Sequence, residues 1–81
     1  MVLQLNEAIS KRLVELLEMY DMTQYQLYKN SGVYKSTIGN VVNCTHESVQ
    51  LRIVHEICQG LRISVREFFN SPLFDDNNLD P

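Results

Sequence analysis

The residues best suited to recognition chemistry lie in the segment SGVYKSTIGN, residues 31–40. It contains two glycines that enclose the polar run YKST, and the apolar Ile38 follows that run. From Met22 through His46 the chain carries two lysines and no acidic side chain, although the whole chain holds 10 carboxylates against 7 lysines and arginines. Because nucleic acids present closely spaced phosphates, a compact polar face without negative charge suits such a partner. The alternative explanation is an ordinary solvated helix face.

Two cysteines and two histidines offer metal chemistry. Cys44-x-His46 and His55-x-x-Cys58 together supply the ligand count of a structural zinc site. The spacing argues against zinc, because Cys-x-His is not a common zinc knuckle and the apolar pattern assigns the face of His55 and Cys58 to the core. We therefore expect free thiols, no metal and no cofactor.

The sequence offers little for catalysis. No Ser/His/Asp or Cys/His arrangement can be placed, no glycine-rich loop is suited to cradle a phosphate, and the carboxylates are scattered. We expect that the protein is not an enzyme.

Length and composition indicate one small domain. The chain has 81 residues, of which 44% are hydrophobic, and its apolar runs are far shorter than the roughly 20 residues that span a bilayer. We expect a cytoplasmic protein without a membrane partner. Residues 1–69 carry seven positive and seven negative side chains, which cancel. The net charge of −3 therefore comes from the aspartates of residues 70–81. We predict a domain over residues 1–69 and an acidic, flexible tail over 70–81, with Leu73 and Phe74 as its possible anchors.

Hydrophobic periodicity predicts helices and no strands. Asn6 is expected to cap a first amphipathic helix. A capping box formed by Thr23 and Gln26 predicts a second helix that begins at Gln24 and runs to about residue 31, where Gly32 ends it.

Three further helices complete the expected fold. The third spans residues 35–42, and the fourth opens near Ser48 and ends about Gly60. Ser64 and Glu67 repeat the capping box for a short fifth helix through Phe69. The predicted fold class is all-α, a compact five-helix bundle.

Two helices joined by a short glycine-containing turn, the second with a polar side, form a helix-turn-helix. Residues 5–69 resemble the lambda-repressor-like, Cro/repressor (XRE) class of DNA-binding domains, which is typical of bacteria and phages. The resemblance depends on these residues: Thr23-Gln24, Leu27, Gly32-Val33, Ser36-Thr37-Ile38, Asn43, Ser48-x-x-Leu51 and Gly60-Leu61-x-Ile63-Ser64.

The resemblance implies residues that contact base edges in the major groove. Lys35, Ser36 and Asn40 occupy the corresponding positions of the family. Lysine can donate to guanine O6 or N7, and asparagine can pair with adenine through two hydrogen bonds.

The resemblance also implies contacts with the DNA backbone. Gln24 lies where the family contacts a phosphate, at the positive end of a helix dipole. Thr37 and Asn43 fall at positions that commonly contact phosphates, although capping of the local backbone is an equal alternative for Thr37. Tyr34 is expected to reach the backbone or a thymine methyl group.

Three positions depart from the family pattern. Tyr28 replaces a small residue, so either the packing differs or its ring turns outward. Cys44 replaces the usual glycine after the third helix, which requires a turn of another shape or a left-handed residue with a β-carbon. Gly39 lies on the groove-facing side. A glycine there destabilises the helix by roughly 1 kcal/mol relative to alanine, and a close approach of the backbone to a base pair would offset this loss. Tolerance within a helix held by tertiary packing is the alternative.

The resemblance implies a sequence-specific DNA-binding transcriptional regulator, most simply a repressor. We expect it to bind double-stranded DNA as a homodimer. The two copies are expected to contact each other through the fifth helix and the residues Phe68, Phe69, Leu73 and Phe74. The alternative is an antitoxin or adaptor that mainly binds a protein partner, through the C-terminal tail or the fourth helix.

Overall fold

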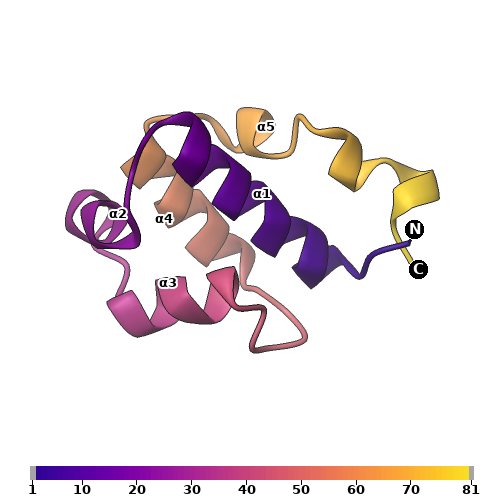
Figure 1. Ribbon diagram of the computed structural model, residues 1–81, viewed down its shortest axis with the longest axis horizontal. Helices are drawn as coiled ribbons and strands as arrows, with labels where there is room; N and C mark the ends of the chain where they lie inside the picture. Colours follow the sequence, from indigo (N-terminus) through magenta and orange to yellow (C-terminus); the bar gives the residue numbers. More distant parts are fainter. Residues whose placement is uncertain (1, 81) are drawn as a thin grey trace.

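The computed structural model describes residues 2–80, which form five α-helices followed by two short 3-10 helices (Figure 1). The described residues contain no β-strand, and this confirms the predicted all-α, five-helix fold. The elements are α1 (Leu5–Met19), α2 (Gln24–Ser31), α3 (Lys35–Val42), α4 (Leu51–Leu61), α5 (Val65–Phe68), η1 (Pro72–Phe74) and η2 (Asp76–Asn78).

The predicted bounds of α2 and α3 are confirmed. The capping box before α2 is complete: the Thr23 hydroxyl accepts from the Gln26 N–H at 3.1 Å, and the Thr23 N–H donates to Gln26 Oε1 at 2.8 Å. Gly32 ends α2 in the left-handed conformation, with φ of 76°, and its N–H donates to the Tyr28 carbonyl at 3.0 Å.

The predicted cap of α1 is wrong. The helix begins at Leu5, and Gln4 is its N-cap, in a capping box in which the Gln4 N–H donates to Glu7 Oε1 at 2.8 Å. Asn6 lies within the first turn instead, where its amide is free to contact another segment.

The start of α4 also differs from the prediction. It begins at Leu51 rather than near Ser48. The chain leaves α3 through Cys44, whose φ is 54°, and the Thr45 N–H donates back to the Asn40 carbonyl at 2.9 Å. Residues 43–50 are therefore a loop, and Cys44 adopts the left-handed conformation although it has a β-carbon, which is one of the two alternatives expected from the sequence.

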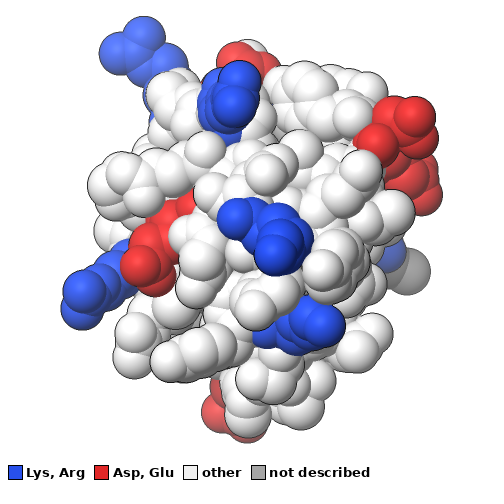
Figure 2. Space-filling view, turned by 90° about the vertical axis from the view of Figure 1, so that its left-hand side faces the viewer, with Lys and Arg blue, Asp and Glu red and all other residues white. Residues whose placement is uncertain are grey.

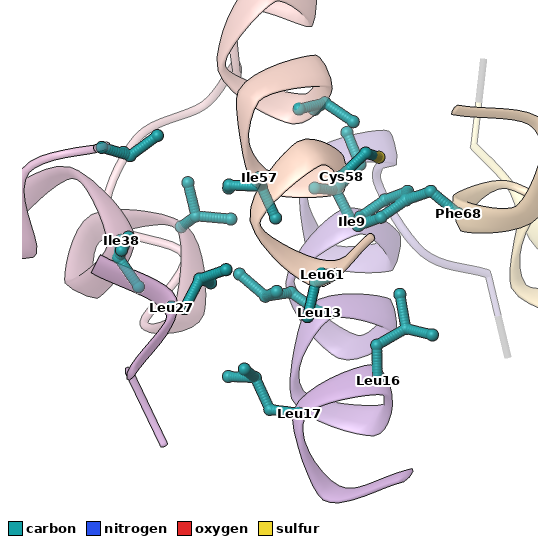
Figure 3. Close-up of a cluster of buried hydrophobic side chains, with 13 residues drawn as sticks. Ile9, Leu13, Leu16, Leu17, Leu27, Ile38, Ile57, Cys58, Leu61 and Phe68 are labelled. Atoms are coloured by element: carbon teal, nitrogen blue, oxygen red, sulfur yellow. The ribbon is translucent and has the colours of Figure 1, made fainter. Parts of the chain in front are cut away.

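The core joins the inner faces of α1, α2, α3 and α4 to one aromatic ring of α5 (Figure 3). Leu13, Leu16, Leu27 and Ile38 are fully buried. Burial of this apolar surface is the main favourable contribution to folding, and it fixes α3 because Ile38 and Val41 cannot leave the core without exposing it. The buried cluster consists of Ile9, Leu13, Leu16, Leu17, Leu27, Val33, Ile38, Val41, Val54, Ile57, Cys58, Leu61 and Phe68.

Helices α2 and α4 approach each other closely at Gly60. A β-carbon built on Gly60 would lie 2.6 Å from Ser31 Cβ, 3.0 Å from Ser31 Cα and 2.9 Å from Leu27 Cδ1. These separations are shorter than carbon atoms tolerate, so the position requires a glycine although it lies inside a helix.

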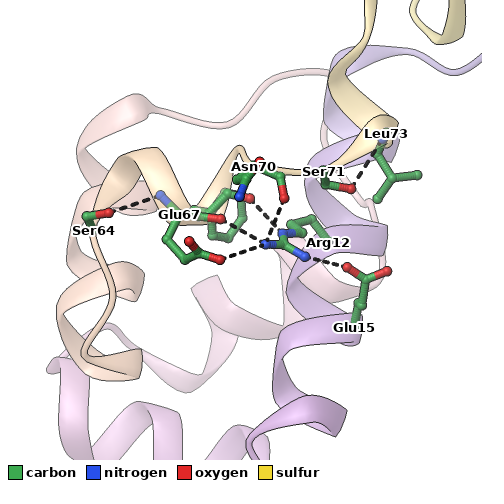
Figure 4. A network of polar contacts seen from close by, with 8 residues as sticks. Arg12, Glu15, Ser64, Glu67, Asn70, Ser71 and Leu73 are labelled. Atoms are coloured by element: carbon green, nitrogen blue, oxygen red, sulfur yellow. Dashed lines mark hydrogen bonds and ion pairs between the residues drawn. The ribbon is translucent and has the colours of Figure 1, made fainter.

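A buried guanidinium connects α1 to the end of α5 (Figure 4). Arg12 is 4% exposed, and it donates from Nε to the Phe68 carbonyl at 2.7 Å and from Nη2 to the Glu67 carbonyl at 2.8 Å. Its other terminal nitrogen pairs with the Glu15 carboxylate. Arg12 thus gives the Phe68 carbonyl at the end of α5 a partner and adds a second donor to the Glu67 carbonyl, which also accepts from the Asn70 N–H at 3.2 Å.

The C-terminal segment has a defined position beside α1 and the N-terminus (Figure 1). The Leu3 N–H donates to the Asn78 carbonyl at 2.9 Å, and the Asp80 N–H donates to the Leu3 carbonyl at 2.8 Å. The polar composition of this segment predicts a flexible tail. Composition carries no information about a backbone pairing with residues at the other end of the chain. The division at residues 69 and 70 and the mobility of the tail stay predictions.

The aromatic residues expected at a dimer interface pack on one another. The ring centroids of Phe68 and Phe69 lie 5.1 Å apart, and those of Phe69 and Phe74 lie 4.8 Å apart. Phe68 is 1% exposed, so its side chain is a core residue and the prediction that it contacts a second copy is wrong. The rings of Phe69 and Phe74 are half-buried.

The close approach of α2 and α4 leads to a stability prediction. Gly60→Ala should lower the free energy of unfolding by about 1–3 kcal/mol, because the added methyl group overlaps Ser31. Gly39→Ala is the matched control: a β-carbon at Gly39 meets no atom within 4 Å, so this variant should gain up to about 1 kcal/mol from helix propensity. Urea unfolding measures both, and equal stability of the two variants would contradict the packing argument.

Candidate nucleic-acid interface

The turn between α2 and α3 sets the direction of α3. Val33 is 5% exposed and anchors the turn in the core, while its N–H donates to the Ser31 hydroxyl at 3.1 Å. The next residue, Tyr34, is 76% exposed and precedes α3 as its N-cap. One side of α3 is consequently held against the core, and the other side faces outward.

The outer side of α3 carries a polar stripe. Ser36, Asn40 and Asn43 follow one another at four- and three-residue spacing, which places them on one helix face. Ser36 and Asn43 are exposed, and Asn40 is half-buried. Their hydroxyl and amide groups can donate and accept hydrogen bonds, so the stripe can distinguish donor and acceptor patterns on a surface that it touches.

A hollow adjoins this stripe on the side of the loop that follows α3. It measures about 500 Å³, and Thr37 and Asn40 contribute to its wall from α3. Asn6 of α1 and Gln50, the N-cap of α4, face it from the other elements. The hollow therefore exposes Thr37 to an approaching partner beside the polar stripe.

On the opposite side of the stripe, the first side chain of α3 lies against α2. The Lys35 ammonium lies 4.9 Å from the ring centroid of Tyr25 and 5.3 Å from that of Tyr28. Tyr28, which departs from the family pattern, is half-buried and also packs against the core. Its ring thus takes part in both the core and the contact with the lysine.

Two other predicted residues lie exposed at this surface. Gln24 is the first residue of α2 and is exposed, because the capping box uses Thr23 and Gln26 and leaves the Gln24 side chain free. Gly39 is half-buried within α3 and has open space at the position where a β-carbon would project. Packing within the protein therefore does not require a glycine at residue 39.

The charge distribution of this end of the molecule favours an anion. Figure 2 shows blue side chains along the middle of the face and at its left margin, with red ones at the top, the right and the bottom and one red group left of the centre. Within residues 2–80, Arg12 is the only residue that supplies a positive group to an ion pair, so Lys29 of α2 and Lys35 of α3 form none there. Cations that are not already paired can neutralise phosphates.

Comparison with known families decides the identity of this arrangement. Residues 12–72 match the family model of the Cro/C1-type HTH DNA-binding domain. The chain belongs to this family. The match supports a role as a DNA-binding regulator in general, and proteins of this family are typically not enzymes. Comparisons with curated proteins and with solved structures gave no significant match.

Two polar side chains of α1 that the sequence did not single out for this purpose hold the end of α3 in this Cro/C1-type domain. The Asn6 amide donates to Cys44 Sγ at 3.3 Å and to the His46 carbonyl at 2.9 Å, and the Ser10 hydroxyl donates to the Val42 carbonyl at 2.7 Å. These bonds hold the end of α3 and the following loop against α1. No local pattern could have revealed them, because the partners lie more than 30 positions apart along the chain.

The cysteines and histidines do not assemble into a metal site. His55 is exposed whereas Cys58 is 1% exposed, so the expectation that both lie on the core face is wrong for His55. Within residues 2–80 no three histidine, cysteine or acidic side chains lie close enough together to hold a metal ion. In the same part of the chain, no helix has the length and apolar character needed to cross a membrane.

Burial of Cys58 predicts a pH dependence of stability. Desolvation raises the pKa of its thiol from 9.0 to about 11. Between pH 9 and 11 the unfolded chain releases this proton and the folded protein retains it. The free energy of unfolding therefore keeps the full contribution of the buried thiol below pH 9 and loses it as the pH rises toward 11.

The free energy of unfolding should therefore fall less steeply across this pH range in Cys58→Ala than in the unchanged protein. Cys44→Ala, at a half-buried position, serves as the control. Urea titrations at several pH values measure the slopes, and equal slopes in the protein and in Cys58→Ala would contradict the assignment.

Proposed function

We propose that this Cro/C1-type domain is a sequence-specific transcriptional regulator, most simply a repressor, that inserts α3 into the major groove of DNA. The observation that carries the proposal is the polar stripe of α3 on a segment without acidic side chains, next to Lys35, which forms no ion pair within residues 2–80. An α-helix fits the major groove, where each base pair presents a distinct pattern of donors and acceptors.

Base recognition is assigned to Lys35, Ser36 and Asn40. Asn40 lies in the stripe beside Ser36, so both can reach neighbouring base edges from one helix face. The open space at Gly39 supports a close approach of the α3 backbone to the groove, since within residues 2–80 no atom outside the local helix backbone lies within 4 Å of the place where a β-carbon would project.

Backbone contacts are assigned to Gln24, Thr37, Asn43 and Tyr34. All four are at least partly exposed, and Gln24 begins α2, where free amides and the positive end of the helix dipole favour a phosphate. Contacts of this kind fix the position of the protein on DNA without conveying base information.

The division into base and backbone contacts is testable on a site selected from a random DNA pool. Asn40→Ala or Lys35→Ala should weaken the free energy of binding to that site by about 1–3 kcal/mol and relax the base preference at one position per half-site. Gln24→Ala should instead weaken binding to all sequences about equally. Competition against single-base variants at fixed salt concentration separates the two patterns.

If Asn40→Ala keeps the ranking of every base variant, its assignment is wrong. That result would favour the alternative function, an antitoxin or adaptor that binds a protein. The observation that favours this alternative is the exposed acidic surface of Asp75, Asp76 and Asp80 at the C-terminal segment.

Binding as a homodimer is the second part of the proposal. One eight-residue recognition helix contacts few base pairs, so useful specificity requires two copies on half-sites about one helical turn apart. Phe69, Leu73 and Phe74 remain partly exposed and supply an apolar surface for the contact. Sedimentation with the selected duplex should give two protein chains per site, and a one-to-one complex on a non-palindromic site would contradict dimeric binding.

A further inference from the structure

Two tyrosine rings of α2 form a cradle under the Lys35 ammonium. The ring centroids of Tyr25 and Tyr28 lie 6.0 Å apart with an interplanar angle of 54°. The ammonium lies within 5.3 Å of both centroids. Distances below about 6 Å place a cation in the range of attraction to the ring quadrupole.

The cradle is not explained by the needs of the core. Tyr25 is 54% exposed, so packing in the core does not account for a large aromatic side chain at this position. Tyr28 is half-buried against the core, which fixes the position of the ring pair relative to α3. No carboxylate lies between residues 22 and 46 to compete locally for the lysine.

A cradle of this kind changes what Lys35 can do. A lysine side chain has a long, flexible stem and loses rotamer freedom when it binds at one place. Rings that already restrict the ammonium reduce this loss. The ammonium has three N–H donors, and a ring face occupies only one side of it, so the other side remains available for an acceptor.

We propose that Tyr25 and Tyr28 are positioning residues for DNA recognition. They hold the Lys35 ammonium at the start of α3 so that it presents its donors to guanine O6 or N7 in the groove. This inference rests on the proposed function, because it assigns a role in base recognition to side chains that contact the lysine.

The test compares Tyr25→Leu, which removes the ring, with Tyr25→Phe, which keeps it. On the selected DNA site, Tyr25→Leu should weaken binding about two- to fivefold and relax base preference at the position that Lys35 contacts. Tyr25→Phe should retain both the affinity and the preference. Tyr20→Leu, at a 42% exposed tyrosine outside the cradle, is the matched control and should behave like the unchanged protein.

A double-mutant cycle distinguishes positioning from a separate DNA contact. In a Lys35→Ala background, Tyr25→Leu should cause no further loss, because the group that the ring positions is absent. Full additivity of the two losses would overturn the proposal. Binding to DNA by Tyr25→Leu as tight and as selective as by the unchanged protein would overturn it as well.

A measurement without DNA separates this inference from the proposed function. Ring currents should shift the proton signals next to the Lys35 ammonium upfield in the nuclear magnetic resonance spectrum, and Tyr25→Leu should reduce that shift. Absence of the shift overturns the cradle itself. If the shift is present but the unchanged protein selects no DNA sequence, the proposed function fails and the positioning role fails with it.

Discussion

The close approach of α2 and α4 at Gly60 is the constraint on which the candidate interface depends. With no β-carbon at that position, Ser31 and the fully buried Leu27 lie directly against α4. This contact fixes α2, and the turn at Gly32 and Val33 then fixes α3. An isolated eight-residue helix is only marginally stable in water, so α3 takes both its stability and its orientation from this packing.

The residues that stabilise the fold are distinct from those assigned to recognition. Arg12 joins α1 to the end of α5 inside the protein, and the apolar faces meet in one core. Lys35 and the polar stripe of Ser36, Asn40 and Asn43 make little contribution to that core. Such a division allows the outer residues of α3 to change sequence preference at little cost to folding, because exposed substitutions usually have small effects on stability.

The overall negative charge does not conflict with a DNA partner, because the charges are separated in space. The C-terminal segment with its aspartates lies at the opposite end of the molecule from α2 (Figure 1), and the longest dimension is 35 Å. Physiological salt screens exposed charges over about 8 Å. The α2 and α3 segment, which carries no acidic side chain between residues 22 and 46, therefore has a local potential that the net charge of the chain does not describe.

The sequence by itself determined the helices of the helix-turn-helix, because their signals are local. The Thr23 and Gln26 capping box, the left-handed Gly32 and the apolar Ile38 each act within one or two helical turns. The polar run around Lys35 and Ser36 likewise indicated that the third helix has a polar side.

Only the tertiary structure decided the partners of Asn6, the burial of Arg12 and Phe68, the pairing of Leu3 with Leu79 and the cradle under Lys35. Each depends on segments that folding brings together from distant parts of the chain or across the turn, and neither periodicity nor local propensity carries that information.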